Sequence, residues 1–284
     1  MQAPDLSLVV TTQGRTAELA RLLASLEEQG ETSIEVILVD QTGPPLCGRH
    51  GELLGRTSVA RSLHLRSGPT SLSRARNLGL EHAQGRVVGF PDDDCWYPSG
   101  TLQRVAAWFG EWSGYDLLLG GYTEPGRSNP RFLVPPCDLT PWRVVTLANS
   151  VGLFIRREEF QDLRFAESLG AGTAFPCGEE MDLLLRALSE GRRGRFEPSV
   201  VVYHRIERPR SGGMYAWVRA NAYVLMRHAL RPSLPLMLRA GGGLVGSFIR
   251  ATRGAGTWEE LVAKVHGFRD ALHDGRMRGS GIHA

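Results

Sequence analysis

The sequence is poor in lysine and cysteine. Lys264 is the only lysine, so arginine carries nearly all of the positive charge. Its planar guanidinium suits bidentate contacts with phosphate, although genome composition also explains such an excess. The four cysteines, Cys47, Cys95, Cys137 and Cys177, form no CxxC pair. This spacing argues against a zinc site and a disulfide framework, and it indicates reduced thiols.

Three further features of the sequence limit the location and the partners that we expect for the protein. The chain does not open with a basic segment followed by an apolar stretch, so we expect no signal peptide. The most apolar late segment, 234–249, is too short and too interrupted to span a bilayer. The net charge of +3 is too small to indicate nucleic-acid binding. We therefore expect a cytoplasmic protein that binds no nucleic acid.

Apolar strands alternate with amphipathic helices in the first hundred residues. The pattern predicts strands at 6–10, 34–40 and 86–90, with helices at 16–30 and 71–85 between them. This alternation is typical of an α/β fold with a mostly parallel central sheet flanked by helices. Ligands bind beyond the carboxyl ends of such strands, which here carry "TTQGR", "VDQTG" and "PDDD". The three polar ends predict one shared crevice, with chance polar loops as the alternative.

The second half of the chain is less regular. It contains three further strand patterns, at 115–121, 151–160 and 195–205, and a strong helix pattern at 178–191. After Gly213 the sequence becomes helical and basic. That part could rest on an anionic membrane surface, or pack against the rest of the chain or a second subunit.

Three consecutive carboxylates, Asp92, Asp93 and Asp94, directly follow a buried strand. Carboxylate oxygens are hard ligands that suit Mg²⁺ or Mn²⁺, and Mg²⁺ is usually held by one or two carboxylates together with substrate phosphates. A solvated turn is the alternative, because like charges repel weakly in water. The buried strand before them favours the cation.

The segment "SRARNLGLEHAQGRVVGFPDDDCWYP" resembles the central part of inverting family 2 glycosyltransferases, which have the GT-A fold. The resemblance extends to "LSLVVTTQGR" and "VILVDQTG" upstream and to "GEEMDLLLRAL" and "VVYHR" downstream, over about 200 residues. It implies a catalytic domain over 1–212, with a donor half (about 1–120) and an acceptor half (about 121–212). Residues 213–284 would form a helical C-terminal extension.

The resemblance also implies a donor-binding site. Thr12 and Asp40 would line the nucleobase and ribose pocket, with Arg15 at its edge. Arg76 would contact the base or a phosphate. The family often has a Pro-Thr-aromatic-Asn-Arg sequence where this chain has "TTQGR", so the resemblance does not define the exact contacts of this first loop.

The three aspartates match the family's DXD motif, which binds Mn²⁺ or Mg²⁺. Asp94 would ligate the metal directly, and His204 matches a histidine that many members use as a further ligand. Asp92 or Asp93 would reach the ribose or the waters of the metal. A histidine after a strand can also be purely structural.

The family's acid pair corresponds to Glu179 and Glu180, where Glu-Asp is more usual. Glu180 would be the base that takes a proton from the acceptor hydroxyl, with Glu179 as its rival. Acidic residues at a helix start are also favoured by the macrodipole, whatever the function. Asp182, further along the same helix, is expected on its polar face.

The implied activity is metal-dependent transfer of a sugar, with inversion, from a nucleotide-diphosphate sugar to the hydroxyl of a saccharide or lipid-linked acceptor. Polysaccharide or glycolipid synthesis is the expected setting, with peripheral membrane contact and a homodimer as further expectations. A nucleotidyltransferase and an inactive nucleotide-sugar-binding protein are the alternatives. The loop 205–215 could close over the donor through Arg208 or Arg210, or be an exposed basic loop.

Overall fold

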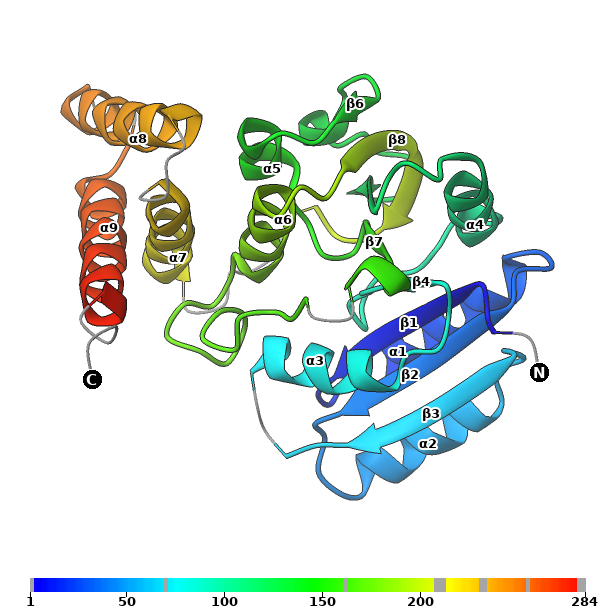
Figure 1. Cartoon of the computed structure of the whole chain (residues 1–284). Coiled ribbons are helices and arrows are strands. Elements are labelled where there is room, and N and C mark those ends of the chain that lie inside the picture. The colour runs from blue at the N-terminus through cyan, green and yellow to red at the C-terminus, as the bar shows by residue number, and fades with distance from the viewer. Residues whose placement is uncertain are drawn as a thin grey trace.

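The computed structural model describes residues 3–68, 71–160, 163–206, 213–229, 234–253 and 256–279, and these form one eight-stranded sheet flanked by helices (Figure 1). The strand order is β3-β2-β1-β4-β7-β5-β8-β6. The strands are β1 (Leu6–Thr12), β2 (Ile34–Asp40), β3 (Arg61–Arg66), β4 (Val87–Gly89), β5 (Leu117–Thr123), β6 (Cys137–Asp138), β7 (Leu153–Arg156) and β8 (Gly194–Tyr203).

Nine α-helices lie within the described ranges. They are α1 (Thr16–Ser25), α2 (Leu46–Gly55), α3 (Leu72–His82), α4 (Thr101–Glu111), α5 (Pro141–Leu147), α6 (Glu179–Ser189), α7 (Gly213–Ala229), α8 (Leu234–Thr252) and α9 (Trp258–Gly279). Short 3₁₀ turns occupy Leu26–Glu28, Pro130–Phe132 and Arg157–Phe160.

The sheet separates two hydrophobic cores. Alternate side chains of β1 point to opposite faces, so Val9 packs in one core while Leu8 and Val10 pack in the other. The core of Val9 is covered by α3, α5 and α6, and the opposite core is covered by α1, α2 and α4. The predicted α/β layering is confirmed.

The sheet is parallel in its first half and mixed in its second. Strands β3, β2, β1 and β4 run parallel, whereas β7 is antiparallel to both β4 and β5. The carboxyl ends of β1, β2 and β4 therefore meet at one edge, and Thr12 pairs in register with Asp40. This edge carries the candidate site.

Some elements had no clear sequence signal. The edge strand β3 reads "RSLHLR" and is partly exposed along its whole length; it has only two apolar residues, Leu63 and Leu65, so its alternation is too short to indicate a strand by itself. The preceding helix α2 buries only three side chains, Cys47, His50 and Leu54, and one of these, His50, is not a typical core residue. The position of both elements is therefore determined by tertiary packing and not by a hydrophobic pattern in their own sequence.

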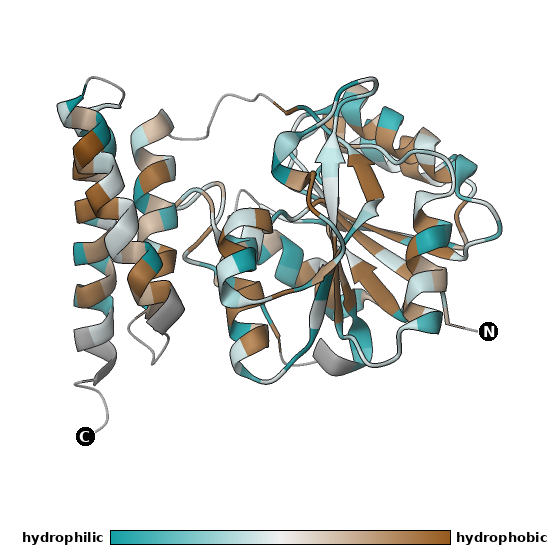
Figure 2. Cartoon of the chain, turned by 90° about the horizontal axis from the view of Figure 1, so that it is seen from above, coloured by the Kyte–Doolittle hydropathy of each residue, from teal (hydrophilic) through white to brown (hydrophobic). Residues whose placement is uncertain are grey.

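The three C-terminal helices lie together beside the α/β layers (Figures 1 and 2). Tyr223 of α7 donates a hydrogen bond to Asp274 of α9 (2.9 Å), and Arg219 pairs with Asp270 (2.7 Å). A Cβ at Gly267 would clash with the carbonyl oxygen of Arg219, so glycine is what lets α9 approach α7 this closely. Within the described residues, no helix is long and apolar enough to cross a membrane.

Candidate functional site

The acidic turn after β4 is tied to two strands through its backbone. Asp92 forms a parallel bridge with Thr11 of β1, and the amide of Cys95 donates to the carbonyl of Asp92 (3.1 Å). Trp96 then exchanges two backbone hydrogen bonds with Tyr203, the last residue of β8 (2.8 and 2.9 Å). The turn is therefore held beside the residue that follows β8, which is His204.

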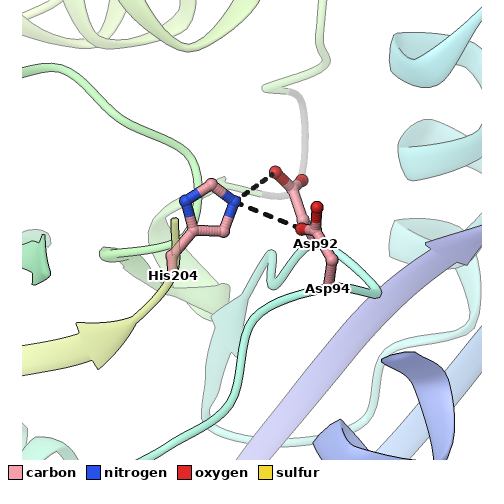
Figure 3. A group of neighbouring side chains, drawn as sticks. All are labelled: Asp92, Asp94 and His204. Atoms are coloured by element: carbon pink, nitrogen blue, oxygen red, sulfur yellow. Dashed lines mark ion pairs between the residues drawn. The ribbon is translucent and has the colours of Figure 1, made fainter. Parts of the chain in front are cut away.

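Asp92, Asp94 and His204 come together as a cluster that could hold a metal ion (Figure 3). The Nε2 atom of His204 lies 3.2 Å from Oδ1 of Asp94 and 3.7 Å from Oδ2 of Asp92. One ligand atom from each residue lies within 4.8 Å of the others. Two carboxylates and an imidazole suit Mn²⁺ or Mg²⁺ and leave coordination positions for substrate oxygens.

The ring of His204 is held in place by its surroundings. Its amide donates to the carbonyl of Thr123 (2.8 Å), and its ring packs edge-on against Tyr122 with the centroids 5.2 Å apart. Only 1% of the residue is exposed. A fixed imidazole facing two carboxylates is consistent with a ligand that needs little reorganisation on binding.

Asp93 points away from this cluster, toward β1. It accepts hydrogen bonds from the hydroxyl of Thr12 (2.8 Å) and from the guanidinium of Arg15 (3.0 Å). The same Arg15 guanidinium also binds Asp94 (2.9 Å). Burial raises the pKa of Asp93 to about 6, against the opposing effects of Thr12 and Arg15. These hydrogen bonds and the positive charge of Arg15 therefore help to hold the three carboxylates together against their mutual repulsion.

Arg21 is a contact that no motif indicated. Its guanidinium donates to the backbone carbonyl of Asp94 (2.8 Å) and lies 3.8 Å above the ring of Trp96. It comes from α1, beyond the first loop. This arginine gives the acidic turn a further support, in addition to strands β1 and β8 and the side chain of Arg15.

Arg76 joins the acidic turn to the acid pair. One of its Nη atoms donates to Oδ1 of Asp92 (2.9 Å) and the other to Oε1 of Glu179 (3.0 Å). The residue is 1% exposed, and its planar fork spans the two carboxylates as a lysine could not. The family resemblance assigns Arg76 to the donor; in the structure its guanidinium also positions protein groups.

Glu179 and Glu180 form the first turn of α6, directly after Gly178. Gly178 has φ +89°, a left-handed conformation that glycine adopts without strain. Glu179 is buried, and burial together with the neighbouring Glu180 raises its pKa, while Arg76 opposes the rise. Glu180 is only partly buried. Of the two carboxylates, Glu180 is thus the more accessible to an incoming acceptor.

Asp40 lies at the same sheet edge, beside Thr12, but its carboxylate is fully buried. Oδ2 contacts Nδ1 of His50 (2.9 Å) and Nε2 of His64 (3.1 Å), and Oδ1 accepts from the amide of Thr42 (2.9 Å). Burial raises its pKa, but these hydrogen bonds outweigh that effect and leave the pKa below its usual value. Neither histidine belongs to a motif, so no pattern in the sequence indicated this cluster.

The expectation for Asp182 was wrong. This residue does not lie on a polar face but is fully buried between α6 and α7. It binds Nε2 of His228 (2.9 Å) and Nε of Arg186 (2.9 Å), with Arg227 at 3.8 Å. The sequence of α6 alone does not show this burial, because it is α7 that packs over Asp182. The lid expected from Arg208 or Arg210 lies outside the described residues.

Comparison with known proteins agrees with this geometry. A model of the family "Glycosyl transferase family 2" matches residues 7–131, which include β1, the acidic turn and Arg76. Residues 7–131 are thus similar to glycosyl transferase family 2 proteins. The polar strand ends, the acidic turn and the arginine that bridges it to the acid pair all belong to the matched segment.

Two curated relatives of this chain come from Bacillus subtilis. The chain is 31% identical over 144 residues to a protein named "Uncharacterized glycosyltransferase EpsJ", covering 50% of this chain and 40% of that one. It is 22% identical over 226 residues to "Minor teichoic acid biosynthesis protein GgaB", covering 74% of this chain and 24% of that one. The chain thus spans less than half the length of either relative.

Solved structures show the same GT-A fold. Staphylococcus aureus TarS in complex with UDP-GlcNAc is similar with a TM-score of 0.61 and 18% identity, over 96% of this chain and 92% of that one. The mannosyltransferase PcManGT of Pyrobaculum calidifontis, in complex with GDP-Man and Mn²⁺, has a TM-score of 0.64 and 17% identity. That match covers 99% of this chain and 80% of that one. The predicted fold is confirmed, including the helical C-terminal region.

Proposed function

We propose that the protein transfers a sugar from a nucleotide-diphosphate sugar to an acceptor hydroxyl, with inversion at the anomeric carbon. The observation that carries this proposal is the convergence of the cluster Asp92, Asp94 and His204 with the acid pair through the single side chain of Arg76. A site for a metal–diphosphate unit and a general base thus belong to one connected set of residues.

The donor would bind at the edge of the sheet where β1, β2 and β4 end. Thr12, Arg15 and Asp93 form a connected wall there, and Asp40 lies beside Thr12. Because its carboxylate is already bonded to two histidines and an amide, we propose that Asp40 shapes the nucleotide pocket through this buried cluster.

Asp94 and His204 would hold Mn²⁺ or Mg²⁺, with Asp92 as the third member of the set. When bound, the cation would offset negative charge on the departing nucleotide diphosphate. Two similar structures contain UDP-GlcNAc in one case and GDP-Man with Mn²⁺ in the other, which supports this donor class.

Glu180 would act as the base. Its partly exposed carboxylate can accept the proton of the acceptor hydroxyl as that oxygen attacks the anomeric carbon from the side opposite the nucleotide. Glu179 is buried against Arg76, so we assign it a positioning role toward Asp92 through that guanidinium.

We propose a catalytic domain over 1–212, with a donor half at about 1–120 and an acceptor half at about 121–212, and a helical extension over 213–284. The acceptor would be a saccharide or a lipid-linked saccharide in polysaccharide or glycolipid synthesis in the cytoplasm, a setting that the name of the GgaB relative supports. A membrane or a second copy of the chain would meet the protein at its C-terminal helices.

Two measurements test the proposal. Ligands that bind only the folded state raise the melting temperature, so a panel of nucleotide diphosphates is compared with and without Mn²⁺. We expect one nucleotide to give a Mn²⁺-dependent shift that Asp94→Asn abolishes. The absence of any shift would contradict the donor site.

Glu180→Gln should keep that shift but lower turnover about 100-fold or more, because the amide cannot take the acceptor proton. Glu190→Gln, the same change at the exposed end of α6, is the matched control and should leave turnover unchanged. Normal turnover of Glu180→Gln, with loss in Glu179→Gln, would transfer the role of base to Glu179.

A further inference from the structure

Helix α8 exposes a continuous apolar face. Its five exposed large apolar side chains are between 41% and 64% exposed: Met237, Leu238, Val245, Phe248 and Ile249. At about 100° per residue these positions fall within an arc of about 120° on the helix. The other residues of 237–252 in that arc, Gly241 and Thr252, carry no charge. We call the five large residues the α8 apolar face.

The opposite side of α8 packs against the protein. Ala240, Ser247 and Ala251 are buried there, and Lys264 of α9 donates to the hydroxyl of Ser247 (2.6 Å). The helix is thus anchored by its small residues, while its large residues point to solvent. This is the reverse of what packing within the chain alone would favour.

Neighbouring elements extend the apolar face. Trp258 at the start of α9 is 55% exposed and lies edge-on to Phe248, with the ring centroids 6.0 Å apart. On the other side, Leu238 and Trp142 of α5 line a cavity of about 510 Å³. Trp142 is itself 49% exposed. Apolar surface therefore continues from α8 in both directions.

The charges along α8 are all of one sign. Residues 234–253 include Arg239, Arg250 and Arg253 and contain no aspartate or glutamate. The helix positions of these arginines lie together, along one edge of the apolar face. Arg250 pairs with Glu260 of α9 (2.6 Å), yet its side chain remains 47% exposed. An apolar stripe with phenylalanine and tryptophan, bordered by arginine, is typical of helices that lie in a membrane interface.

We propose that the α8 apolar face rests on an anionic lipid bilayer, with the arginine edge among the lipid headgroups. A second copy of the chain fits this face less well. In a two-fold dimer the face would meet its own copy, and α8 offers no carboxylate to pair with the opposing arginines. A bilayer supplies both hydrocarbon for the apolar side chains and negative charge for the arginines.

The full-length protein, without donor, is sedimented with vesicles of mixed phosphatidylglycerol and phosphatidylcholine and with vesicles of phosphatidylcholine alone. We expect binding to the anionic vesicles, weaker binding to the neutral ones, and a decrease at high salt, where headgroup charge is screened. Failure to bind anionic vesicles at low salt would overturn the proposal. Because no nucleotide is present, the result is independent of the proposed reaction.

The double variant Leu238→Glu/Phe248→Glu should lower the partition coefficient for anionic vesicles by at least about tenfold. Leu133→Glu, at a residue that is 69% exposed in the α/β part, makes the same change elsewhere and should bind as wild type. Circular dichroism and the melting temperature establish that both variants fold. Equal vesicle binding by the folded double variant and by wild type would overturn the proposal. It would also be overturned if light scattering showed that wild type is a dimer and that the double variant is a monomer.

Discussion

Asp182→Asn should weaken the attachment of α7 to α6. The carboxylate of Asp182 is fully buried and faces three basic side chains, those of Arg186, Arg227 and His228. Asparagine has nearly the same shape but no charge. The substitution therefore removes the electrostatic part of the interaction while leaving the packing in place.

The magnitude follows from the pKa of Asp182. Burial raises this pKa, but the hydrogen bond to His228 and the charges of Arg186, His228 and Arg227 lower it from 3.8 to about 2. At about 1.4 kcal/mol for each tenfold change in an acid dissociation constant, the ionised form is favoured by about 2 kcal/mol. An asparagine side chain at this position would resemble the protonated acid, so we expect a loss of about 2 kcal/mol in the free energy of unfolding.

The pH dependence has a definite sign. Because the folded pKa lies below the unfolded one, the contribution is fully present above pH 3.8 and is lost as the pH falls through about 2. The difference in stability between wild type and Asp182→Asn should therefore be largest above pH 3.8. It should shrink as the pH falls from 3.8 toward 2.

Urea unfolding at a series of pH values measures this difference. Asp138→Asn is the matched control, because Asp138 also pairs with an arginine but its side chain is 60% exposed. Exposed pairs contribute about 0–1 kcal/mol, so this variant should unfold almost as wild type does. Equal stabilities of Asp182→Asn and Asp138→Asn at neutral pH would refute the reasoning.

Two further substitutions probe the site and its support. Arg76→Lys should lower the free energy of unfolding by about 2 kcal/mol and reduce turnover, because one ammonium group cannot bridge Asp92 and Glu179. Urea unfolding and a sugar-transfer assay measure the two effects. Wild-type values in both experiments would contradict the bridge. Gly79→Ala should cost about 1–3 kcal/mol, since its Cβ would clash with Cγ1 of Val9 between α3 and the sheet. The control is Gly110→Ala, where an added Cβ would meet open space, and it should be neutral or stabilising in the same unfolding experiment. Equal effects at the two positions would argue against the close approach of α3 to the sheet.

The acidic turn could be located from the sequence because local signals determine it. A buried apolar strand, three carboxylates and a helix with Arg76 before them are all readable without a partner. The parallel arrangement of neighbouring strands then predicts that Thr12, Asp40 and the aspartates share one edge, and the structure places them there.

Contacts between distant segments were harder to foresee. Trp96 pairs with Tyr203 across more than a hundred residues, and this pairing brings His204 to Asp94. No local pattern encodes which strand end meets which turn. For His204, only its order along the chain, taken from a family resemblance, pointed to the right neighbour.

The layered α/β architecture, the edge of the sheet that carries the polar residues and the helix that begins with the acid pair all follow from the order of residues along the chain. The orientation of individual charged groups does not follow from that order. Asp93 turns to Thr12 and Arg15, and Arg76 spans two carboxylates. Asp182 is buried because α7 packs against α6. Hydrophobic periodicity is a local property, whereas the partner and the burial of a charge depend on segments that pack against it from elsewhere in the chain.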